Sequence, residues 1–567
     1  MSRPHVLIVG AGGVFGARLA RMLARRHAFR ITLAGRTESH IVPLQRELAA
    51  IDGQGEYGFV TLDRETIGVE RLREIACQVV VDCSGPFQTS GTKLITAAIG
   101  ARCHYLDLAD ARSFVAAIGN FDSAARAVGI AVISGASTTP GLTHAVIDHY
   151  AGKWRDIDSI DVAIVPGNRT PKGRAVIASI LSWVGQPVRV FREARWQEAA
   201  GWSGGRHIRL EGLKRRQAFL AELPDLDLLP RRYSPRVRAE FAAGMELGIL
   251  NRMLQVASWV TRLGLVSDAS LFTAPGTMVA QALDRFGTDE GGMQIEVAGR
   301  DARGDSRVMR WSLVAKSGDG PYVPVVVAAA LVAGLVAGHG PLPGARSAAG
   351  LVSLEQIKPW LDPLQVETNH LSYRGEKPLF ARVIGADFEH LPEVTRRLHR
   401  GRPAVIGDGE ALVIPARGAL ARRLSRAFGL PTEPGEQPLR VVIESRAGEE
   451  HWTRFFGTQA MRSVMRQPGS RKARKGSGDP PSGHAPDTLI EERFGPMRAT
   501  MRLTPRGDGL DMHLVSARFG WVPLFGPLKP VIKAEERVDA DGNHRFDVDI
   551  GLPLIGRLVA YRGYLKI

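Results

Sequence analysis

The stretch HVLIVGAGGVFG, residues 5–16, decides how the chain begins to fold. Its first five residues are mainly apolar and β-branched, so they predict a buried strand that ends at Val9. Glycines follow at once, and the pattern of residues 14–27 predicts a helix directly behind them. Glycine lets the backbone turn tightly and approach a pyrophosphate that rests on the helix N-terminus. A strand, a glycine turn and a helix in this order therefore predict a dinucleotide-binding fold.

The spacing of the glycines departs from GxGxxG, because Phe15 occupies the third glycine position and Gly16 follows it. The same stretch also reads as GxxGxxG through Gly10, Gly13 and Gly16. A glycine-rich structural turn is the alternative, but a second strand follows at the distance that a nucleotide site requires. The residues expected to contact the cofactor in this motif are Gly10, Gly12, Gly13, Val14, Phe15 and Gly16.

The end of the second expected strand indicates which dinucleotide is preferred. NAD enzymes usually carry Asp or Glu there, which binds the ribose 2′-hydroxyl. Here the strand runs into Gly35, Arg36 and Thr37, and the first carboxylate is Glu38. The guanidinium of Arg36 suits a 2′-phosphate and the Thr37 hydroxyl can add a hydrogen bond, so the sequence predicts NADP(H) as cofactor. The alternative is that Arg36 is a solvated surface residue.

Short β-branched runs alternate with helical patterns through residues 1–150. Strands are expected at residues 5–9, 30–34, 56–62, 79–83, 104–108 and 130–134, and helices at 14–27, 41–50, 69–76, 92–99 and 112–128. This alternation predicts an α/β fold in which helices cover both faces of a doubly wound parallel sheet. Residues 1–150 are therefore expected to form a Rossmann domain.

The pattern changes after this domain. Residues 151–368 mix strands and helices and predict an α+β domain of the substrate-binding or dimerisation type, whose end could return to the first domain. Residues 369–378 are polar and contain Gly and Pro, so they predict a linker. Residues 379–567 predict a third, β-rich domain with strands concentrated after residue 488. Within it, residues 467–486 are of low complexity and predict a disordered loop.

The overall charge is unusual, whereas the rest of the composition is that of a soluble globular protein. The net charge is +16 and the pI is about 10.1, with 23% charged and 44% hydrophobic residues. A basic chain attracts nucleic acid, anionic lipid or phosphorylated small molecules. The basic residues are scattered, and the one dense cluster, residues 471–475, lacks the interleaved aromatic residues of a nucleic-acid platform. We therefore expect a small-molecule substrate and no nucleic-acid partner.

The three cysteines, Cys77, Cys83 and Cys103, form no CxxC pair and indicate a reducing cytoplasm without a disulfide scaffold or metal site. The longest apolar run, residues 323–338, is too short to span a bilayer and predicts a buried helix. Residues 245–266 are a second largely apolar stretch that carries Arg252 and Arg262, and they predict either a helix packed on its own domain or one lying on a membrane surface. A peripheral location at the inner face of the membrane and a homodimer both stay open.

Two groups of residues are candidates for the chemistry beyond the glycine motif. Ligands of such folds bind beyond the carboxyl ends of the strands. The fourth strand is followed by small residues that leave room for the nicotinamide ribose. The residues expected to contact the cofactor there are Ser84, Gly85, Pro86 and Phe87. The alternative is a plain turn that contains Pro and Gly. Hydride transfer often needs a proton donor, and the candidates near the strand ends are Tyr105, Asp107 and His144, with His104 and Asp110 also nearby. Each of these can instead be purely structural.

Together these residues resemble the saccharopine-dehydrogenase-like family over residues 5–365. The resemblance lies in the glycine motif, Gly35 to Thr37, the Cys83 to Phe87 segment, the HYLDL stretch at residues 104–108 and the PGL stretch at 140–142. It implies a Rossmann domain with an inserted α+β domain and NADP-linked reduction of an imine, carbonyl or enoyl group. Residues 379–567 resemble a bacterial domain of unknown function that often follows such a module.

Three functional hypotheses follow. The first is an NADP(H)-dependent oxidoreductase whose substrate the sequence does not identify. The second is a non-catalytic dinucleotide-binding protein with a C-terminal ligand or partner module, and the third is a lipid-related trans-acting reductase. In the C-terminal domain, Trp452, Arg454, Phe455 and Phe456 could line a cavity for an apolar ligand. The core of a β domain is the more common role for such residues and is the interpretation favoured here.

Overall fold

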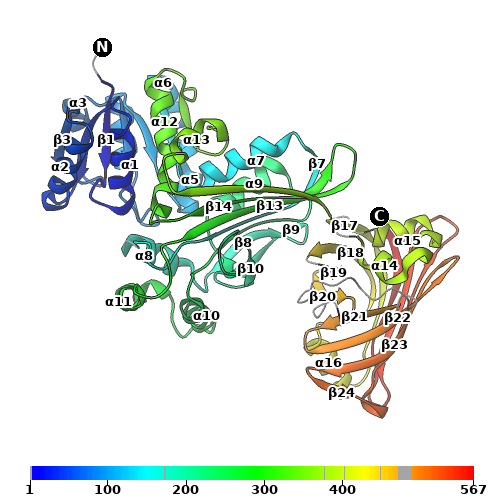
Figure 1. Ribbon diagram of the computed structural model, residues 1–567. Coiled ribbons are helices and arrows are strands. Elements are labelled where there is room, and N and C mark those ends of the chain that lie inside the picture. Colours follow the sequence, from blue (N-terminus) through cyan, green and yellow to red (C-terminus); the bar gives the residue numbers. More distant parts are fainter. Residues whose placement is uncertain (1–2, 172–173, 376, 401–402, 447, 470–487) are drawn as a thin grey trace. The chain divides into compact units, whose positions relative to one another are not determined.

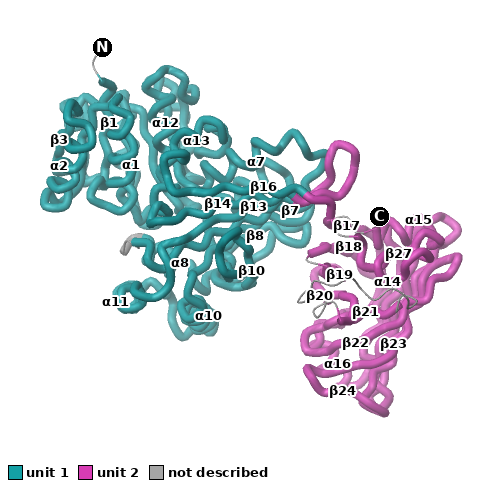
Figure 2. Tube along the Cα trace, viewed as in Figure 1, with its two compact units in different colours: residues 1–297, 309–372 teal, residues 298–308, 373–567 magenta. Residues whose placement is uncertain are grey.

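The computed structural model describes residues 3–171, 174–375, 377–400, 403–446, 448–469 and 488–567. The chain divides into two compact units, shown in different colours in Figure 2. Unit 1 contains residues 1–297 and 309–372, and unit 2 contains residues 298–308 and 373–567. Most of the low-complexity loop predicted at 467–486 lies outside the described residues.

Unit 1 begins with a seven-stranded parallel sheet in the order β15-β6-β5-β4-β1-β2-β3. Its strands are β1 (His5–Val9), β2 (Arg30–Gly35), β3 (Tyr57–Thr61), β4 (Val79–Asp82), β5 (His104–Asp107), β6 (Ala131–Ser134) and β15 (Gly344–Ser347). The predicted Rossmann-type fold is confirmed. The last strand comes from a segment more than 200 residues beyond β6, so the chain does return to this sheet.

Helices cover both faces of this sheet (Figure 1). They are α1 (Val14–Ala24), α2 (Val42–Ile51), α3 (Val69–Ile75), α4 (Lys93–Ala101), α5 (Arg112–Ala117), α6 (Asp122–Val128), α7 (Thr143–Ala151), α12 (Val326–Val336) and α13 (Leu354–Leu361). Successive residues of β1 enter opposite cores, Val6 and Ile8 one core and Leu7 and Val9 the other. The helix predicted at 112–128 is broken by the 3-10 segment η2 (Ile118–Phe121), which contains Gly119 and Asn120, both poor helix formers.

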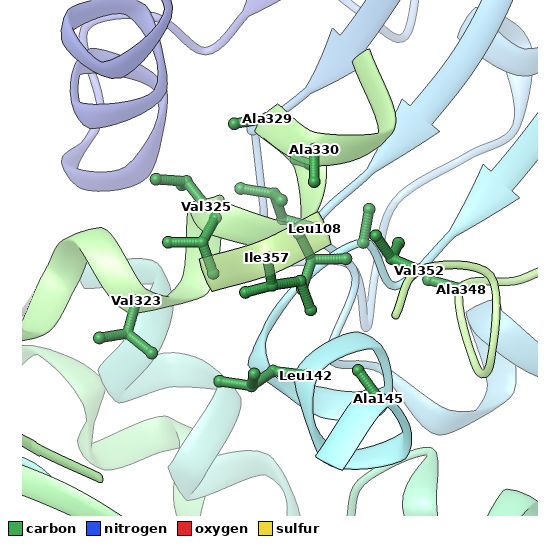
Figure 3. Packing of buried hydrophobic residues seen from close by; sticks show 14 of the residues in the cluster. Leu108, Leu142, Ala145, Val323, Val325, Ala329, Ala330, Ala348, Val352 and Ile357 are labelled. Atoms are coloured by element: carbon green, nitrogen blue, oxygen red, sulfur yellow. The ribbon is translucent and has the colours of Figure 1, made fainter. Parts of the chain in front are cut away.

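The apolar run 323–338 forms a buried helix, as predicted. Residues Gly320–Val325 are a 3-10 segment, η5, and α12 follows with most of its side chains buried. Figure 3 shows Val323, Val325, Ala329 and Ala330 packed with Leu142 and other apolar side chains from separate parts of unit 1. Among the described residues, no helix combines the length and apolar content needed to cross a membrane.

A second, mixed sheet follows in unit 1, in the order β10-β11-β12-β7-β13-β14-β16, with β8 paired to β12 and β9 to β8. Its strands are β7 (Trp154–Val165), β8 (Pro187–Arg192), β9 (Arg195–Ala200), β10 (Arg206–Ile208), β11 (Arg216–Leu220), β12 (Arg238–Ala243), β13 (Gly291–Asp301), β14 (Ser306–Ala315) and β16 (Val366–Arg374). Its helices are α8 (Arg174–Trp183), α9 (Asp225–Tyr233), α10 (Gly248–Arg262) and α11 (Thr273–Leu283).

The linker predicted at 369–378 is wrong for its first six residues, which belong to β16. This strand lies at the edge of the second sheet and most of its side chains are exposed. An exposed edge strand needs no apolar alternation, so its sequence reads like that of a loop.

Unit 2 is an antiparallel β-barrel. Ten strands pair in chain order, and the ring closes where β17 pairs with β27. They are β17 (Ala404–Pro415), β18 (Gly435–Arg446), β19 (Glu449–Phe456), β20 (Gln459–Arg466), β21 (Leu489–Phe494), β22 (Met497–Arg506), β23 (Gly509–Phe519), β25 (Val531–Val538), β26 (His544–Leu552) and β27 (Gly556–Lys566). A short strand, β24 (Val522–Leu524), pairs with β23, and the helices are α14 (Leu379–Ile384), α15 (Glu393–His399) and α16 (Ala419–Ala427). The predicted β-rich domain is confirmed.

Candidate cofactor and active site

The candidate site lies at the carboxyl ends of β1 and β4. The chain runs from β1 to β2 and β3 on one side, and then places β4, β5 and β6 on the other. Loops that leave neighbouring strands in opposite directions form a crevice, and ligands of open α/β sheets bind there. The two loops meet closely, because a Cβ atom on Gly10 would lie 2.9 Å from the Cα atom of Ser84.

The glycine loop has the geometry that a pyrophosphate requires. Gly10 has a φ of +78°, and its N–H donates to the Ala34 carbonyl oxygen at 2.8 Å. Gly13 precedes α1, which begins without a side-chain cap, so N–H groups of its first turn can bind an anion. Gly16 packs α1 against the loop, since a Cβ there would lie 2.3 Å from the Gly10 carbonyl oxygen. The GxxGxxG spacing therefore describes this loop, and Phe15 is half-buried against the core.

Two exposed residues follow β2. Arg36 comes directly after the strand and forms no ion pair within the described part of the chain. Thr37 precedes the 3-10 segment η1 (Glu38–His40). His40, which sequence reasoning missed, faces the glycine loop, because a Cβ on Gly12 would lie 3.0 Å from the His40 Cβ. Two side chains that can carry positive charge thus stand beside the expected position of the cofactor ribose.

On the β4 side of the crevice, the buried carboxylate of Asp82 organises the loop. Its Oδ1 accepts hydrogen bonds from the Ser84 N–H at 2.9 Å and the Ser84 hydroxyl at 2.5 Å. Its Oδ2 lies 3.1 Å from Nη1 of Arg64 and accepts a hydrogen bond from the Tyr105 hydroxyl at 3.3 Å. Burial raises the pKa of Asp82, and the Arg64 charge opposes this shift. Asp82 and Arg64 were not predicted, since a strand-end Asp and a distant Arg give no signal in sequence.

The segment 84–87 lies at the crevice, but its members differ in exposure. Ser84, Gly85 and Pro86 are half-buried at the loop. Phe87 is buried, and its ring centroid lies 5.3 Å from that of Phe114. The Phe87 side chain therefore packs in the core beneath the loop.

The predicted proton donors Tyr105 and Asp107 are both fully buried on β5. The Oδ1 atom of Asp107 accepts hydrogen bonds from the Ser134 hydroxyl at 2.9 Å and the Gly135 N–H at 2.8 Å. Burial raises the pKa of Asp107 to about 7. Its Oδ2 has no hydrogen-bond partner among the described residues. The Asp107 carboxyl thus ties the ends of β5 and β6 together.

The third predicted donor, His144, lies in α7 and is also fully buried. Its Nε2 is 3.5 Å from Oδ1 of Asp225, and its ring stacks on Tyr233 with centroids 5.3 Å apart. No hydrogen bond or ion pair within the described residues joins it to Tyr105 or Asp107. Of the predicted donors, Tyr105 therefore forms a hydrogen bond with Asp82, whereas His144 lies apart from both of the others, beside the buried carboxyl of Asp225.

Another carboxyl, Asp110, is held where the second sheet's helix α8 meets the crevice. The Ser179 hydroxyl, from α8, donates to Oδ2 of Asp110 at 2.9 Å. Gln88, which follows β4, donates through Nε2 to Ser179 Oγ at 2.7 Å and to Asp110 Oδ1 at 3.3 Å. Asp110 is half-buried, and burial raises its pKa. Sequence reasoning could not find Ser179, because only the fold brings it to the loop after β5.

No group of three or more His, Cys, Asp or Glu residues that could hold a metal ion occurs in the described ranges. Cys77 and Cys103 are buried free thiols, and Cys83 is a half-buried one.

Comparison with known proteins matches two parts of the chain. Residues 6–133 match the profile of the family described as saccharopine dehydrogenase NADP binding domain, within the 5–365 range of the resemblance. Residues 391–478 and 481–565 match the family described as domain of unknown function (DUF4166). A search of the curated proteins finds no match.

Among solved structures, the chain is similar to apo saccharopine dehydrogenase (L-Glu forming) from Saccharomyces cerevisiae. The identity is 12%, the match covers 65% of this chain and 100% of that one, and the TM-score is 0.47. It is also similar to a probable dehydrogenase from Thermotoga maritima, with 10% identity, coverage of 63% and 93%, and a TM-score of 0.32. Residues 6–133 are thus similar to the saccharopine dehydrogenase NADP binding domain family, and residues 391–478 and 481–565 are similar to the DUF4166 family.

Proposed function

We propose that the protein is an NADP(H)-dependent oxidoreductase that reduces, or forms by oxidation, a C=N, C=O or enoyl group of a small molecule. The family of residues 6–133 and the crevice at the switch point support NADP(H) binding. When bound there, the cofactor supplies or accepts the hydride. The glycine loop and the first turn of α1 would hold its pyrophosphate, and Arg36 with His40 would hold the 2′-phosphate.

The observation that carries the choice of NADP(H) is the free guanidinium of Arg36. It stands directly after β2, where an NAD-binding domain carries a carboxylate. A planar guanidinium can bind two phosphate oxygens at once. Among the described residues, no carboxylate forms an ion pair with the guanidinium of Arg36.

A proton must accompany hydride transfer to a carbonyl or imine. We propose Asp110 as its source in preference to Tyr105, Asp107 and His144, whose side chains are fully buried. Burial favours the protonated form of Asp110, and the Ser179 hydroxyl and the Gln88 amide hold the carboxyl in place. Asp82 and Arg64 position the neighbouring loop.

Calorimetric titration with NADPH and NADH tests the cofactor proposal. Arg36→Ala should weaken NADPH binding by about tenfold or more, because a hydrogen bond to a charged group is worth about 1.5–3 kcal/mol. The affinity for NADH should not change. Arg46→Ala is the matched control, since Arg46 is an exposed arginine on α2, one of the helices that cover the first sheet. Equal wild-type affinities for the two nucleotides would contradict the proposal.

The alternative function, a non-catalytic dinucleotide-binding protein, predicts a different outcome. Wild-type protein would then bind NADPH but show no turnover with a panel of imine, carbonyl and enoyl substrates.

We also propose that this enzyme works at a membrane surface, because α10 carries an exposed apolar face. Ile249, Met253, Val256 and Trp259 are 54, 45, 60 and 60% exposed, and their spacing of three or four residues places them on one side of the helix. The only charged residues in 248–266 are two arginines. Such a face favours the interface of an anionic lipid layer.

A further inference from the structure

Exposed apolar side chains gather at one end of the barrel in unit 2. Trp521 is 88% exposed, Phe525 73%, Leu528 62% and Leu554 76%. The other large apolar side chains exposed there are Leu420, Val515, Phe519, Val522 and Val531. Apart from Tyr373 on β16, the described part of unit 2 exposes no large apolar side chain elsewhere. Scattered exposed apolar residues need no explanation, whereas a cluster of them marks an interaction surface.

The pairing of the strands brings separate segments to this end. β23 ends at Phe519 and β24 turns back along it, so Trp521 lies in the tight turn between the two strands. β25 runs antiparallel to β23, so its first residue lies at the end where β23 finishes. That first residue pairs with Gly551, directly before the turn that joins β26 to β27 and carries Leu554.

Helix α16 packs at the same end. The Ser425 hydroxyl donates to the Leu558 carbonyl oxygen of β27 at 2.8 Å, and the ring centroid of Phe428 lies 6.5 Å from that of Phe519. Figure 1 shows α16 and β24 at this end of the barrel. The barrel tip is therefore made of three segments, residues 416–429, 515–531 and 551–557.

The charge of the barrel tip is strongly positive. Its three segments contain no Asp or Glu. Their basic residues are Arg417, Arg422, Arg423, Arg426, Arg518, Lys529 and Arg557. Arg557 forms an ion pair with Asp549 at 2.7 Å, but none of the others has a carboxylate partner within the described ranges. Glu433 and Glu436, the first carboxylates after α16, are exposed but too few to balance this charge.

This combination fits the surface of an anionic lipid layer. Tryptophan is enriched at the boundary between water and hydrocarbon, because its ring is amphipathic. Clusters of arginine and lysine beside an apolar surface attract anionic head groups. The most exposed apolar side chains stand on separate turns, so each can enter between lipids without a partner of matching shape.

We propose that the barrel tip is a membrane-docking surface, which inserts Trp521, Phe525 and Leu554 into an anionic lipid layer while the arginines of α16 bind lipid phosphates. The proposal gives unit 2 a role in recruitment and does not depend on the reaction proposed for unit 1. It adds a second contact to the one proposed for α10. A single shallow contact gives marginal membrane binding, and firm anchoring takes two, so each contact should be needed for firm binding.

Binding of the full-length protein to phosphatidylcholine vesicles, with and without phosphatidylglycerol, tests this proposal. Binding should require phosphatidylglycerol and should weaken as the salt concentration rises. Trp521→Ser should weaken binding by about tenfold or more, because it removes a large apolar side chain from the lipid. Arg423→Gln combined with Arg426→Gln should have a similar effect. The matched control, Arg502→Gln with Arg562→Gln, replaces exposed arginines farther along β22 and β27 and should leave binding unchanged.

Vesicles with brominated acyl chains give a local readout, since bromine quenches tryptophan that enters the hydrocarbon. Trp521→Phe should keep the protein bound and remove part of the quenching. Trp452→Phe should remove none of it, because Trp452 is buried in the barrel core.

Equal binding to vesicles with and without phosphatidylglycerol would overturn the proposal, as would unchanged binding of Trp521→Ser. The α10 contact can fail separately: binding lost in Trp521→Ser but kept in Trp259→Glu would refute that contact and support this one. The reverse pattern would overturn the present proposal. Self-association that depends on Trp521, seen by analytical ultracentrifugation without any vesicle binding, would also overturn it and identify a second copy of the chain as the occupant of the tip.

Discussion

Replacing Gly16 by alanine should displace helix α1 and weaken NADP(H) binding. A Cβ atom there would lie 2.3 Å from the Gly10 carbonyl oxygen and 2.8 Å from the Ala11 Cα. Both neighbours are backbone atoms, so no side chain can rotate away. Ordinary contact begins at 3.4 Å, so the start of the helix must retreat by about 1 Å. Forcing a methyl group into a packed site of this kind costs about 1–3 kcal/mol.

The retreat would also lengthen hydrogen bonds from the first turn of α1 to a bound pyrophosphate. Such bonds are worth about 1.5–3 kcal/mol each, so the affinity should fall about tenfold or more. Calorimetry with NADPH measures the affinity, and urea unfolding measures the stability. Gly119→Ala should lower neither, because a Cβ on Gly119 meets nothing within 4 Å. Wild-type values of both quantities for Gly16→Ala would refute the packing argument.

Three further predictions concern other parts of unit 1. Asp110→Asn should lower kcat by about 10²–10⁴-fold and leave the NADPH affinity unchanged. In the wild type, the rate of substrate reduction should fall as the pH rises through the raised pKa of Asp110. A steady-state rate that does not change with pH would contradict this role. Asp107→Asn should flatten the pH dependence of stability. Burial raises the Asp107 pKa from 3.8 to about 7, so the folded protein keeps this proton while the unfolded chain releases it. The free energy of unfolding of the wild type should therefore fall by at most about 4 kcal/mol as the pH rises from about 4 to about 7. Urea midpoints measured across this pH range test the difference. Trp259→Glu should abolish co-sedimentation of the protein with anionic liposomes at low salt. The control Gln255→Glu, an exposed position on the same helix, should leave co-sedimentation intact. Wild-type protein that stays in the supernatant would argue against lipid binding.

Much of the first sheet could be predicted from the sequence, because its buried strands are short, continuous apolar runs between clear turns. The bounds of β1 were predicted to the residue, and those of β2 to β6 to within one residue. Strand β15 gave no such signal, since Gly344–Ser347 pairs with β6 only after a long excursion of the chain. The edge strand β16 was missed because its exposed faces need no apolar pattern.

The candidate site was predictable where it is local. The glycine loop and Arg36 lie within one strand-turn-helix-strand segment, so spacing alone located them. Asp110 and Ser179 are 69 residues apart, and their hydrogen bond depends on how α8 packs. His144 was expected near a ligand because it was placed near the strand ends, yet the fold buries it beside Asp225. Periodicity and motifs do not encode such long-range packing.

The pairing of β15 with β6 has a consequence for synthesis and for truncation. During translation, residues 1–134 can assemble most of the first sheet early, but the outer side of β6 stays unpaired until residues 344–347 emerge. An uncovered strand edge is a template for pairing with other chains. A fragment that ends near residue 150 would keep this edge and would also lack α12, whose apolar side chains fill the adjoining core. Such a fragment should aggregate, whereas one that extends through β16, and so also keeps α13 and covers the edge of β14, should stay monodisperse.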